Sequence, residues 1–134
     1  MSLQIRVIAP DKIVWDADAE EIILPSSTGQ LGILKGHTPL LTALDIGVMR
    51  VKLDKEWQPI ILLGGFAEIE NNNVTILVNG AETISEIDST EAMNNLERAT
   101  SLLAEAKTNK EKIEATQNLR KAKAKMQAAN VLNN

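Results

Sequence analysis

The only histidine of the chain, His37, is the side chain best suited to proton transfer near neutral pH. Ser26, Ser27 and Asp45 lie close enough in sequence to complete a Ser–His–Asp triad on paper. Neither serine, however, stands in a G-x-S-x-G turn or a comparable nucleophile context. A lone histidine beside Thr and Pro in a glycine-rich turn is more often structural. A hydrolase using His37 is therefore the weakest hypothesis, and we expect no catalytic residue in this chain.

Other kinds of chemical site lack their motifs. No phosphate loop of the G-x-x-x-x-G-K-[ST] type occurs, no metal-ligand spacing is present, and cysteine is absent. A net charge of −4 argues against a general nucleic-acid-binding protein. The longest apolar run, residues 60–63, is too short to cross a bilayer. We expect no cofactor, no metal and no nucleic acid, and membrane association only through a partner.

The strongest electrostatic signal is a basic run near the end of the chain, formed by Arg120, Lys121, Lys123 and Lys125. On a helix, Lys121 and Lys125 are four positions apart and share one face. No acid follows Glu114, so pairing within the helix does not balance the run. Nucleic acid, an anionic membrane surface or an acidic protein face could each attract it. Because the segment has no aromatic residue to stack on bases or anchor in lipid, an acidic protein partner is favoured.

The composition changes near residue 87, which divides the elements that carry these residues. Residues 1–86 hold six Lys or Arg against twelve Asp or Glu, in short β-branched runs broken by Gly, Pro and Asn. Residues 87–134 hold eight basic residues against six acidic ones, with no Gly, Pro or aromatic residue. We therefore expect an α+β protein with a β-sandwich domain over 1–86 and a helical domain over 87–134. This division suggests a module that docks and a tail that acts.

Period-two alternation and turn residues predict the strands of the first domain. Leu3, Ile5 and Val7 face one way, while the polar residues between them face the other. We expect a break at 25–29, a turn-rich passage through the glycines of 29–36, and a hairpin turn at 71–73. The predicted strands, spaced as in a sandwich or flattened barrel, are residues 3–7, 13–15, 22–24, 48–53, 59–63, 66–70 and 74–78.

Apolar residues in the tail recur every three or four positions, which is the spacing of a heptad seam. Asp88 or Ser89 can cap a first helix, and the polar residues 107–110 separate it from a second. Such helices form an antiparallel hairpin, and it is weakly held because alanine dominates both seams. Spacing alone fits either a permanent hairpin or one that opens or leaves its dock. The seams are Ala92, Leu96, Ala99, Leu103 and Ala106, then Ala115, Leu119, Ala122, Met126 and Ala129.

Residues 29–42, which read GQLGILKGHTPLLT, closely resemble the signature of the epsilon subunit of F-type ATP synthases. GGFAEI at 64–69 and VTILV at 74–78 are similar to later strands of that family, and Ile87-Asp88 is similar to the start of its helical hairpin. The resemblance covers essentially the whole chain and is to the chloroplast and cyanobacterial branch. It implies an N-terminal flattened β-sandwich followed by a C-terminal antiparallel two-helix hairpin.

The resemblance also implies a non-catalytic rotor subunit in the central stalk of a proton-translocating ATP synthase. The sandwich would clamp to the gamma subunit and rest on the membrane c-ring, through a loop edge that includes Leu31, Lys35 and His37. The hairpin would inhibit ATP hydrolysis when it extends along gamma into the alpha/beta head, where the basic run would face an acidic loop of the catalytic beta subunits. The complex would hold the chain peripherally on the stromal or cytoplasmic face of the thylakoid membrane.

Some bacterial relatives in that family hold ATP through an Ile-Asp-x-x-Arg-Ala motif. Residues 87–92 here read IDSTEA, so Glu91 stands in the place of the arginine and repels phosphate. Arg98, Lys121 and Lys125 offset part of that loss, and we expect no ATP binding. The alternative function is a non-motor sandwich adaptor that binds an acidic protein. The sequence does not decide whether the hairpin rests folded or extended.

Overall fold

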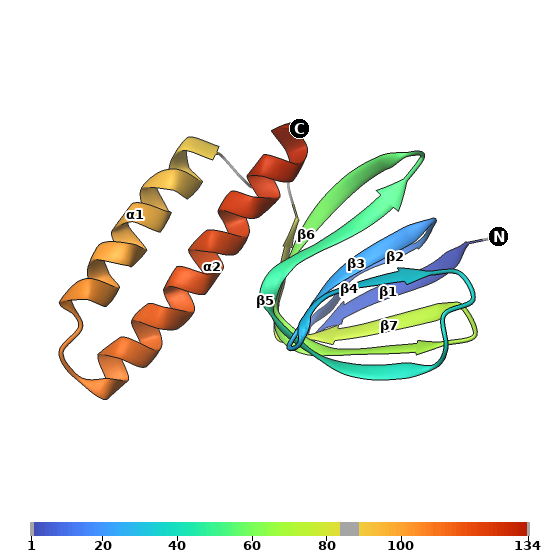
Figure 1. Cartoon of the computed structure of the whole chain (residues 1–134), viewed down its shortest axis with the longest axis horizontal. Coiled ribbons are helices and arrows are strands. Elements are labelled where there is room, and N and C mark those ends of the chain that lie inside the picture. The colour runs from blue at the N-terminus through green and yellow to red at the C-terminus, as the bar shows by residue number, and fades with distance from the viewer. Residues whose placement is uncertain (1, 84–88, 134) are drawn as a thin grey trace.

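The structure, a computed structural model, describes residues 2–83 and 89–133 (Figure 1). Eight strands fold into a β-sandwich, and two antiparallel helices form a layer beside it, which is the α+β arrangement that the sequence predicts. The strands are β1 (Leu3–Ala9), β2 (Lys12–Ala19), β3 (Glu21–Ser26), β4 (Gly29–Leu34), β5 (Leu40–Leu53), β6 (Glu56–Glu70), β7 (Asn73–Val78) and β8 (Ala81–Thr83), and the helices are α1 (Ser89–Glu105) and α2 (Asn109–Asn133).

The two longest strands, β5 and β6, join the layers of the sandwich. The strand order is β2-β1-β7-β6-β5-β3-β4, and β8 pairs with β6 beside this path. β6 bends at Gly64 and Gly65, where φ is +84° and +151°, so that its first half pairs with β8 and its second half with β7. A Cβ on Gly65 would lie 2.0 Å from the Leu77 carbonyl oxygen, so only glycine fits this bend. The prediction of separate strands at 59–63 and 66–70 is therefore wrong: they are one bent strand.

The alternation predicted for the first strand is confirmed, because Leu3, Ile5 and Val7 are all fully buried. Their side chains meet the inward-facing residues of the other strands in one core of branched aliphatic side chains. The aromatic residue Trp15 reaches only the margin of that core, and Met49 is its one methionine among the residues that the structure describes. A core of this kind needs no polar partner, so its stability comes from burial of apolar surface.

Several predictions of strands and their bounds in this domain are wrong. The break predicted at 25–29 is too long, because β3 runs to Ser26 and β4 begins at Gly29. The glycine-rich passage is a strand flanked by two positive φ angles, at Gly29 and Gly36, whereas Gly32 lies within β4 without one. β5 begins at Leu40 rather than at 48, and the sequence pattern does not predict β8. The turn at 71–73 is confirmed by left-handed φ angles at Asn71 and Asn72, which are 50° and 65°.

The helical hairpin is confirmed, and α2 lies between α1 and the sandwich (Figure 1). A capping box starts α2: the Glu111 N–H donates to Thr108 Oγ1 at 3.1 Å, and Glu111 Oε2 accepts the Lys107 N–H at 2.9 Å. All ten predicted seam positions are buried or half-buried. The proposed boundary at 86 and 87 and the cap at Asp88 lie outside the described residues.

Candidate functional site

The hairpin docks on the outer face of β5 and β6 through a very small apolar contact. Ala124 and Ala128 of α2 pack against Val48 and Ile61 of the sheet, and Ile61 and Ala128 are completely buried there. Alanine lets the helix approach the sheet closely, but each alanine brings only one methyl group to the contact. At about 0.8 kcal/mol per buried carbon, the methyl groups of the two alanines together supply only about as much as one large core side chain does.

An ion pair supports this contact at its edge. Lys125 Nζ lies 3.5 Å from Glu82 Oε2, which joins α2 to β8. Both side chains keep about a third of their surface exposed, at 36% and 34%. An exposed pair of this kind contributes about 0.2–1 kcal/mol, and salt weakens it. The dock therefore combines a small apolar patch with one modest electrostatic tie.

The four cations of the basic run lie on different sides of α2. Lys121 and Lys125 are half-buried and line the same groove between the helices, which confirms that they share a face. Arg120 and Lys123 are exposed and do not line that groove. In this folded arrangement the helix therefore presents only half of its basic run fully to solvent.

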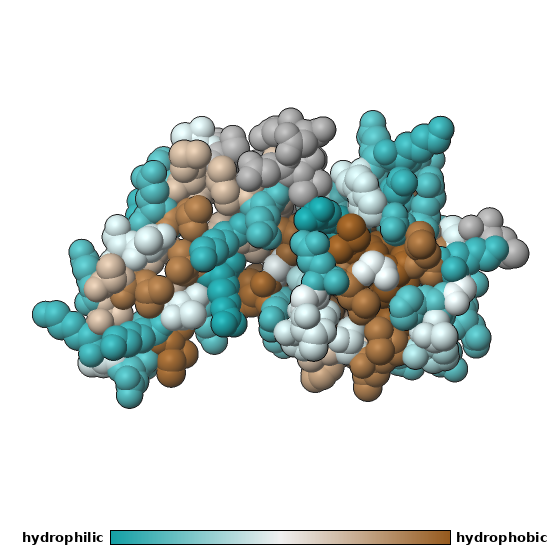
Figure 2. Space-filling model, in the orientation of Figure 1, coloured by the Kyte–Doolittle hydropathy of each residue, from teal (hydrophilic) through white to brown (hydrophobic). Residues whose placement is uncertain are grey.

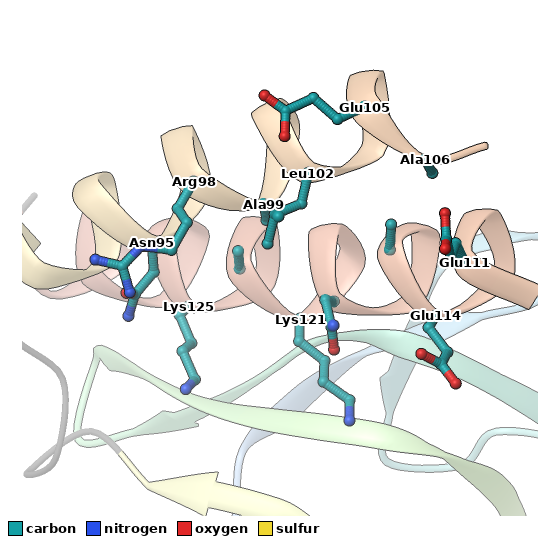
Figure 3. A pocket seen from close by; sticks show the side chains of 13 residues that line it. Asn95, Arg98, Ala99, Leu102, Glu105, Ala106, Glu111, Glu114, Lys121 and Lys125 are labelled. Carbon is teal, nitrogen blue, oxygen red and sulfur yellow. The ribbon is translucent and has the colours of Figure 1, made fainter. Parts of the chain in front are cut away.

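The groove between α1 and α2 has a volume of about 560 Å³ and is lined by charges of both signs. Arg98 of α1 and Lys125 of α2 lie toward one end, and Lys121 lies nearer the middle (Figure 3). The acidic side chains come from the ends of the two helices that meet at the turn. The three acids are Glu105, Glu111 and Glu114.

The three residues predicted for the gamma-facing and ring-facing edge differ in how they meet solvent. Leu31 is half-buried and packs against the sandwich core, whereas Lys35 is exposed. The half-buried His37 donates its Nδ1–H to the Thr38 carbonyl oxygen at 2.7 Å. The loop itself is tied to the β6–β7 turn by the Gly36 N–H, which donates to Asn72 Oδ1 at 2.7 Å.

The histidine-based triad drawn from the sequence is not assembled. Ser26 is buried, and its Oγ lies 3.0 Å from Thr28 Oγ1 and accepts the Thr28 N–H at 3.1 Å. This is a local turn between β3 and β4, and no described hydrogen bond joins His37 to Ser26, Ser27 or Asp45. The hydrolase hypothesis therefore lacks its site.

Sequence reasoning missed the residues that dock the hairpin. The heptad spacing identifies the side of α2 that faces α1, but Ala124 and Ala128 form a second apolar stripe four residues apart on another side. Lysines flank Ala124 in the sequence, so the segment reads as basic and the apolar stripe is not apparent from it. The four-residue interval between Ala124 and Ala128 is the one sequence signal that could have identified this stripe.

The described residues hold neither a cluster of metal-ligating side chains nor a membrane-spanning helix. Among residues 2–83 and 89–133, no group of three or more His, Cys, Asp or Glu side chains could hold a metal ion. Neither described helix is both long and apolar enough to cross a membrane. Hydrophobic side chains do reach the surface between the helices and at the lower edge of the sandwich (Figure 2).

Comparison with known families places both parts of the chain. Residues 2–84 match the family described as "ATP synthase, Delta/Epsilon chain, beta-sandwich domain", and residues 85–130 match "ATP synthase, Delta/Epsilon chain, long alpha-helix domain". Among relatives, the chloroplastic ATP synthase epsilon chain of Gracilaria tenuistipitata var. liui is 70% identical over 100% of both chains. That of Pyropia yezoensis is 74% identical over 96% of both chains, and the epsilon chain of Thermosynechococcus vestitus is 59% identical over 96% of both.

Solved structures show the same fold at low sequence identity. A chain in the cryo-EM structure of the Euglena gracilis mitochondrial ATP synthase (OSCP/F1/c-ring, rotational state 1) aligns with a TM-score of 0.82 and 21% identity, over 96% of this chain and 81% of that one. A chain in the central stalk/c-ring structure of the Tetrahymena thermophila mitochondrial ATP synthase aligns with a TM-score of 0.64 and 15% identity, over 96% of both chains.

Proposed function

The chain belongs to the ATP synthase delta/epsilon-chain family, as an epsilon chain of the chloroplast and cyanobacterial type, and from this premise we propose how its two parts divide the work. It is a non-catalytic subunit of the central stalk of F-type ATP synthase. The sandwich, residues 1–86, docks the chain in the rotor, and the hairpin, residues 87–134, is a brake on ATP hydrolysis. Family membership decides against the non-motor adaptor.

The partners of the two parts differ. The sandwich contacts the gamma subunit and the membrane c-ring, with Leu31, Lys35 and His37 at the edge involved. Lys35 is exposed there, and the loop is held in place by Asn72. The hairpin contacts the catalytic alpha and beta subunits through the basic run when it leaves the sandwich. The chain works peripherally, on the stromal or cytoplasmic face of the thylakoid membrane.

The observation that carries the brake proposal is that α2 holds both the weak dock and the basic run. Ala124 lies between Lys123 and Lys125, Ala128 follows one helical turn later, and Lys125 is paired with Glu82 while the helix is docked. Leaving the sandwich would free Lys125 and expose Lys121, so all four cations would become available together. The folded hairpin is then the permissive state, and the released hairpin is the inhibiting one.

The test is the ATPase activity of the reconstituted catalytic head with gamma, measured with the full chain and with a chain that ends at Glu86. The truncated chain should still bind gamma, while inhibition of hydrolysis weakens strongly or disappears. Circular dichroism of the truncated chain checks that it is folded. Equal inhibition by a folded truncated chain would remove the hairpin from the mechanism.

A further inference from the structure

One dipeptide of the sandwich, Asn79-Gly80, combines two residue types that react with each other. It is the only Asn-Gly pair in the chain, and it joins β7 to β8. In such a pair the backbone nitrogen of the glycine attacks the side-chain carbonyl carbon of the asparagine, and a succinimide ring forms. Glycine has no Cβ beside the attacking nitrogen and allows the backbone rotation that the attack requires. The reaction needs no enzyme, so local geometry decides where it occurs.

Backbone hydrogen bonds anchor this pair on both sides but leave the attacking nitrogen available. The Asn79 N–H donates to the Gly64 carbonyl oxygen at 3.0 Å. The Gly80 carbonyl oxygen accepts the Leu63 N–H at 2.9 Å. Within the part of the chain that the structure describes, however, no acceptor lies within hydrogen-bond distance of the Gly80 N–H. The nitrogen that would attack is therefore not held in a competing interaction.

The side-chain amide of Asn79 is accessible and weakly held. The residue is exposed, and its Nδ2 donates to the Leu63 carbonyl oxygen at 3.4 Å, beyond the usual range of about 2.7–3.2 Å. Asn94, within α1, differs because the next N–H belongs to the helical hydrogen-bond ladder. Asn72 also differs, since its Oδ1 accepts the Gly36 N–H at 2.7 Å and the residue after it is not glycine. Of these asparagines, Asn79 is the one most open to attack.

The Asn79-Gly80 pair lies where the bent strand β6 meets the dock of the hairpin. Leu63 accepts a hydrogen bond from Asn79 and donates one to Gly80, and its side chain packs against the apolar contact under α2. Shortly after Gly80, Glu82 of β8 forms the ion pair with Lys125 of α2. A change in the main chain at Asn79 therefore acts on both the apolar and the electrostatic support of the dock.

We propose that Asn79 is a site of spontaneous deamidation and that the product loosens the dock of the hairpin. The Gly80 nitrogen bonds to Asn79 Cγ, the Cγ–Nδ2 bond breaks, and ammonia leaves with the proton of the Gly80 N–H. Water then opens the succinimide at either of its two carbonyl groups. One opening gives aspartate at position 79, and the other gives isoaspartate, whose main chain runs through the former side chain. The amide and water are thereby converted to a carboxylate and an ammonium ion.

The two products disturb the bend in different ways. Isoaspartate adds one carbon to the main chain between the hydrogen bonds to Gly64 and Leu63, so β8 loses its register with β6. Glu82 is then displaced from Lys125, and Leu63 from the dock. Aspartate keeps the length of the main chain, but its carboxylate only accepts hydrogen bonds and so repels the Leu63 carbonyl oxygen. The stronger effect on the dock is therefore expected from isoaspartate.

The first test incubates the isolated full-length chain at mildly alkaline pH, which favours loss of the proton from the attacking nitrogen, and follows deamidation by mass spectrometry. Cleavage after glutamate separates residues 71–82 from residues 92–97, and fragment ions locate the converted residue. Asn79 should gain the mass of an acid in place of an amide, with Asn94 as the internal reference. Conversion at Asn79 no faster than at Asn94 would overturn the proposal.

Gly80→Ala tests the role of the glycine and should slow the conversion of Asn79 several-fold, because the added Cβ hinders the attack. The fold tolerates this variant, since Gly80 does not adopt a left-handed φ and the new Cβ would meet only the Leu63 side chain, 3.1 Å from Cδ1. An unchanged rate in Gly80→Ala would show that the Gly80 nitrogen is not the attacking group.

The second test measures amide hydrogen exchange of α2 before and after incubation. In the converted chain, exchange should become faster by a factor of about 1.4 to 5, the range that corresponds to loss of an exposed ion pair. Asn79→Gln, incubated in the same way, is the matched control, because its longer side chain does not form the succinimide and its exchange should stay unchanged. Asn79→Asp carries the new charge on an ordinary main chain and should accelerate exchange less than isoaspartate does. Unchanged exchange in a chain that contains isoaspartate would overturn the link to the dock.

The consequence for ATP hydrolysis rests on the proposed function, in which release of the hairpin inhibits. The converted chain should then inhibit the reconstituted catalytic head more strongly than the fresh chain does. If exchange of α2 accelerates and inhibition does not change, the proposed brake is wrong, while the modification of Asn79 and its effect on the dock stand. If Asn79 stays unconverted, the inference fails and the proposed function is unaffected.

Discussion

The sandwich and the hairpin bury different kinds of side chain. This difference explains why the sandwich is held firmly together while the hairpin can be released from it. Leu3, Ile5 and Ile22 in the sandwich are completely buried among other branched aliphatic residues. Among residues 90–129 of the hairpin, the buried residues are all alanines, and the leucines of its seams are only half-buried. Large buried side chains stabilise by about 1.5–3 kcal/mol each, and alanine by far less. One part of the chain is thus held firmly together, and the other can be detached from it.

The location of charge strengthens this contrast. Among the described residues, the sandwich core contains no ionisable side chain, so its packing depends little on salt. The hairpin is held to the sheet by an exposed ion pair, Glu82–Lys125, beside a patch of two alanines. Salt and competing charges can therefore act on the contact between the parts without acting on the core.

The largest expected effect is on stability, and it should differ between the two parts. Ile5→Ala should lower the free energy of unfolding by about 2–5 kcal/mol, because it leaves a cavity in a closely packed core. Leu119→Ala removes a half-buried seam residue and should cost only about 1 kcal/mol. Denaturant unfolding followed by circular dichroism measures both. A larger loss of unfolding free energy in Leu119→Ala than in Ile5→Ala would contradict the claim that the sandwich is the more firmly held part.

The next effect is on inhibition. Replacing Arg120, Lys121, Lys123 and Lys125 together with Ala preserves helix propensity and should weaken inhibition of ATP hydrolysis several-fold. The contacts are individually worth about 0.2–1 kcal/mol, so the quadruple change is the informative one. A control variant replaces the three lysines near the turn, Lys107, Lys110 and Lys112, with Ala. Full inhibition by the quadruple variant would assign the brake to bulk or apolar contacts.

A smaller effect is expected from the tie between the parts. Glu82→Gln removes the acid that faces Lys125 and should shift the hairpin toward release, by a factor of about 1.4 to 5 if the pair contributes about 0.2–1 kcal/mol. Amide hydrogen exchange of α2 in the isolated chain should become faster, and inhibition should become slightly stronger. Glu56→Gln, which neutralises another acid of the sandwich, is the control. Unchanged exchange in Glu82→Gln would show that the alanines alone hold the dock.

No effect is expected from ATP on the isolated chain. Arg98, Lys121 and Lys125 do line one groove, but Lys125 is paired with Glu82 and three acids line the same groove. Glu91 adds a further negative charge in the place of the arginine found in ATP-binding relatives. Titration calorimetry should detect no saturable binding at millimolar ATP or below, whereas Glu91→Arg should improve binding. Saturable heat with the unchanged chain would contradict this prediction.

Sequence patterns correctly predicted those elements in which buried side chains recur at a regular interval along a single strand or helix. The alternation of Leu3, Ile5 and Val7 and the seams of the hairpin are confirmed because burial follows strand and helix geometry directly. The bend in β6 was not predictable, since its two glycines also fit a turn, and only the Leu77 carbonyl beside Gly65 explains them.

The candidate site was predictable only in part. The shared face of Lys121 and Lys125 follows from their spacing. The contact of Ala124 and Ala128 with Val48 and Ile61, and the pairing of Lys125 with Glu82, join segments far apart in sequence. Such contacts depend on how the elements pair and dock, which no local period specifies.

The central claim is that the docked hairpin permits ATP hydrolysis and the released hairpin inhibits it. Because the chain has no cysteine, Val48→Cys with Ala124→Cys introduces one pair of thiols, at two positions of the same packed contact. Each single variant is the control, and mobility on a non-reducing gel reports the cross-link. In the reconstituted head, the oxidised double variant should not inhibit hydrolysis, and reduction should restore inhibition. Strong inhibition by a fully cross-linked chain would contradict the account.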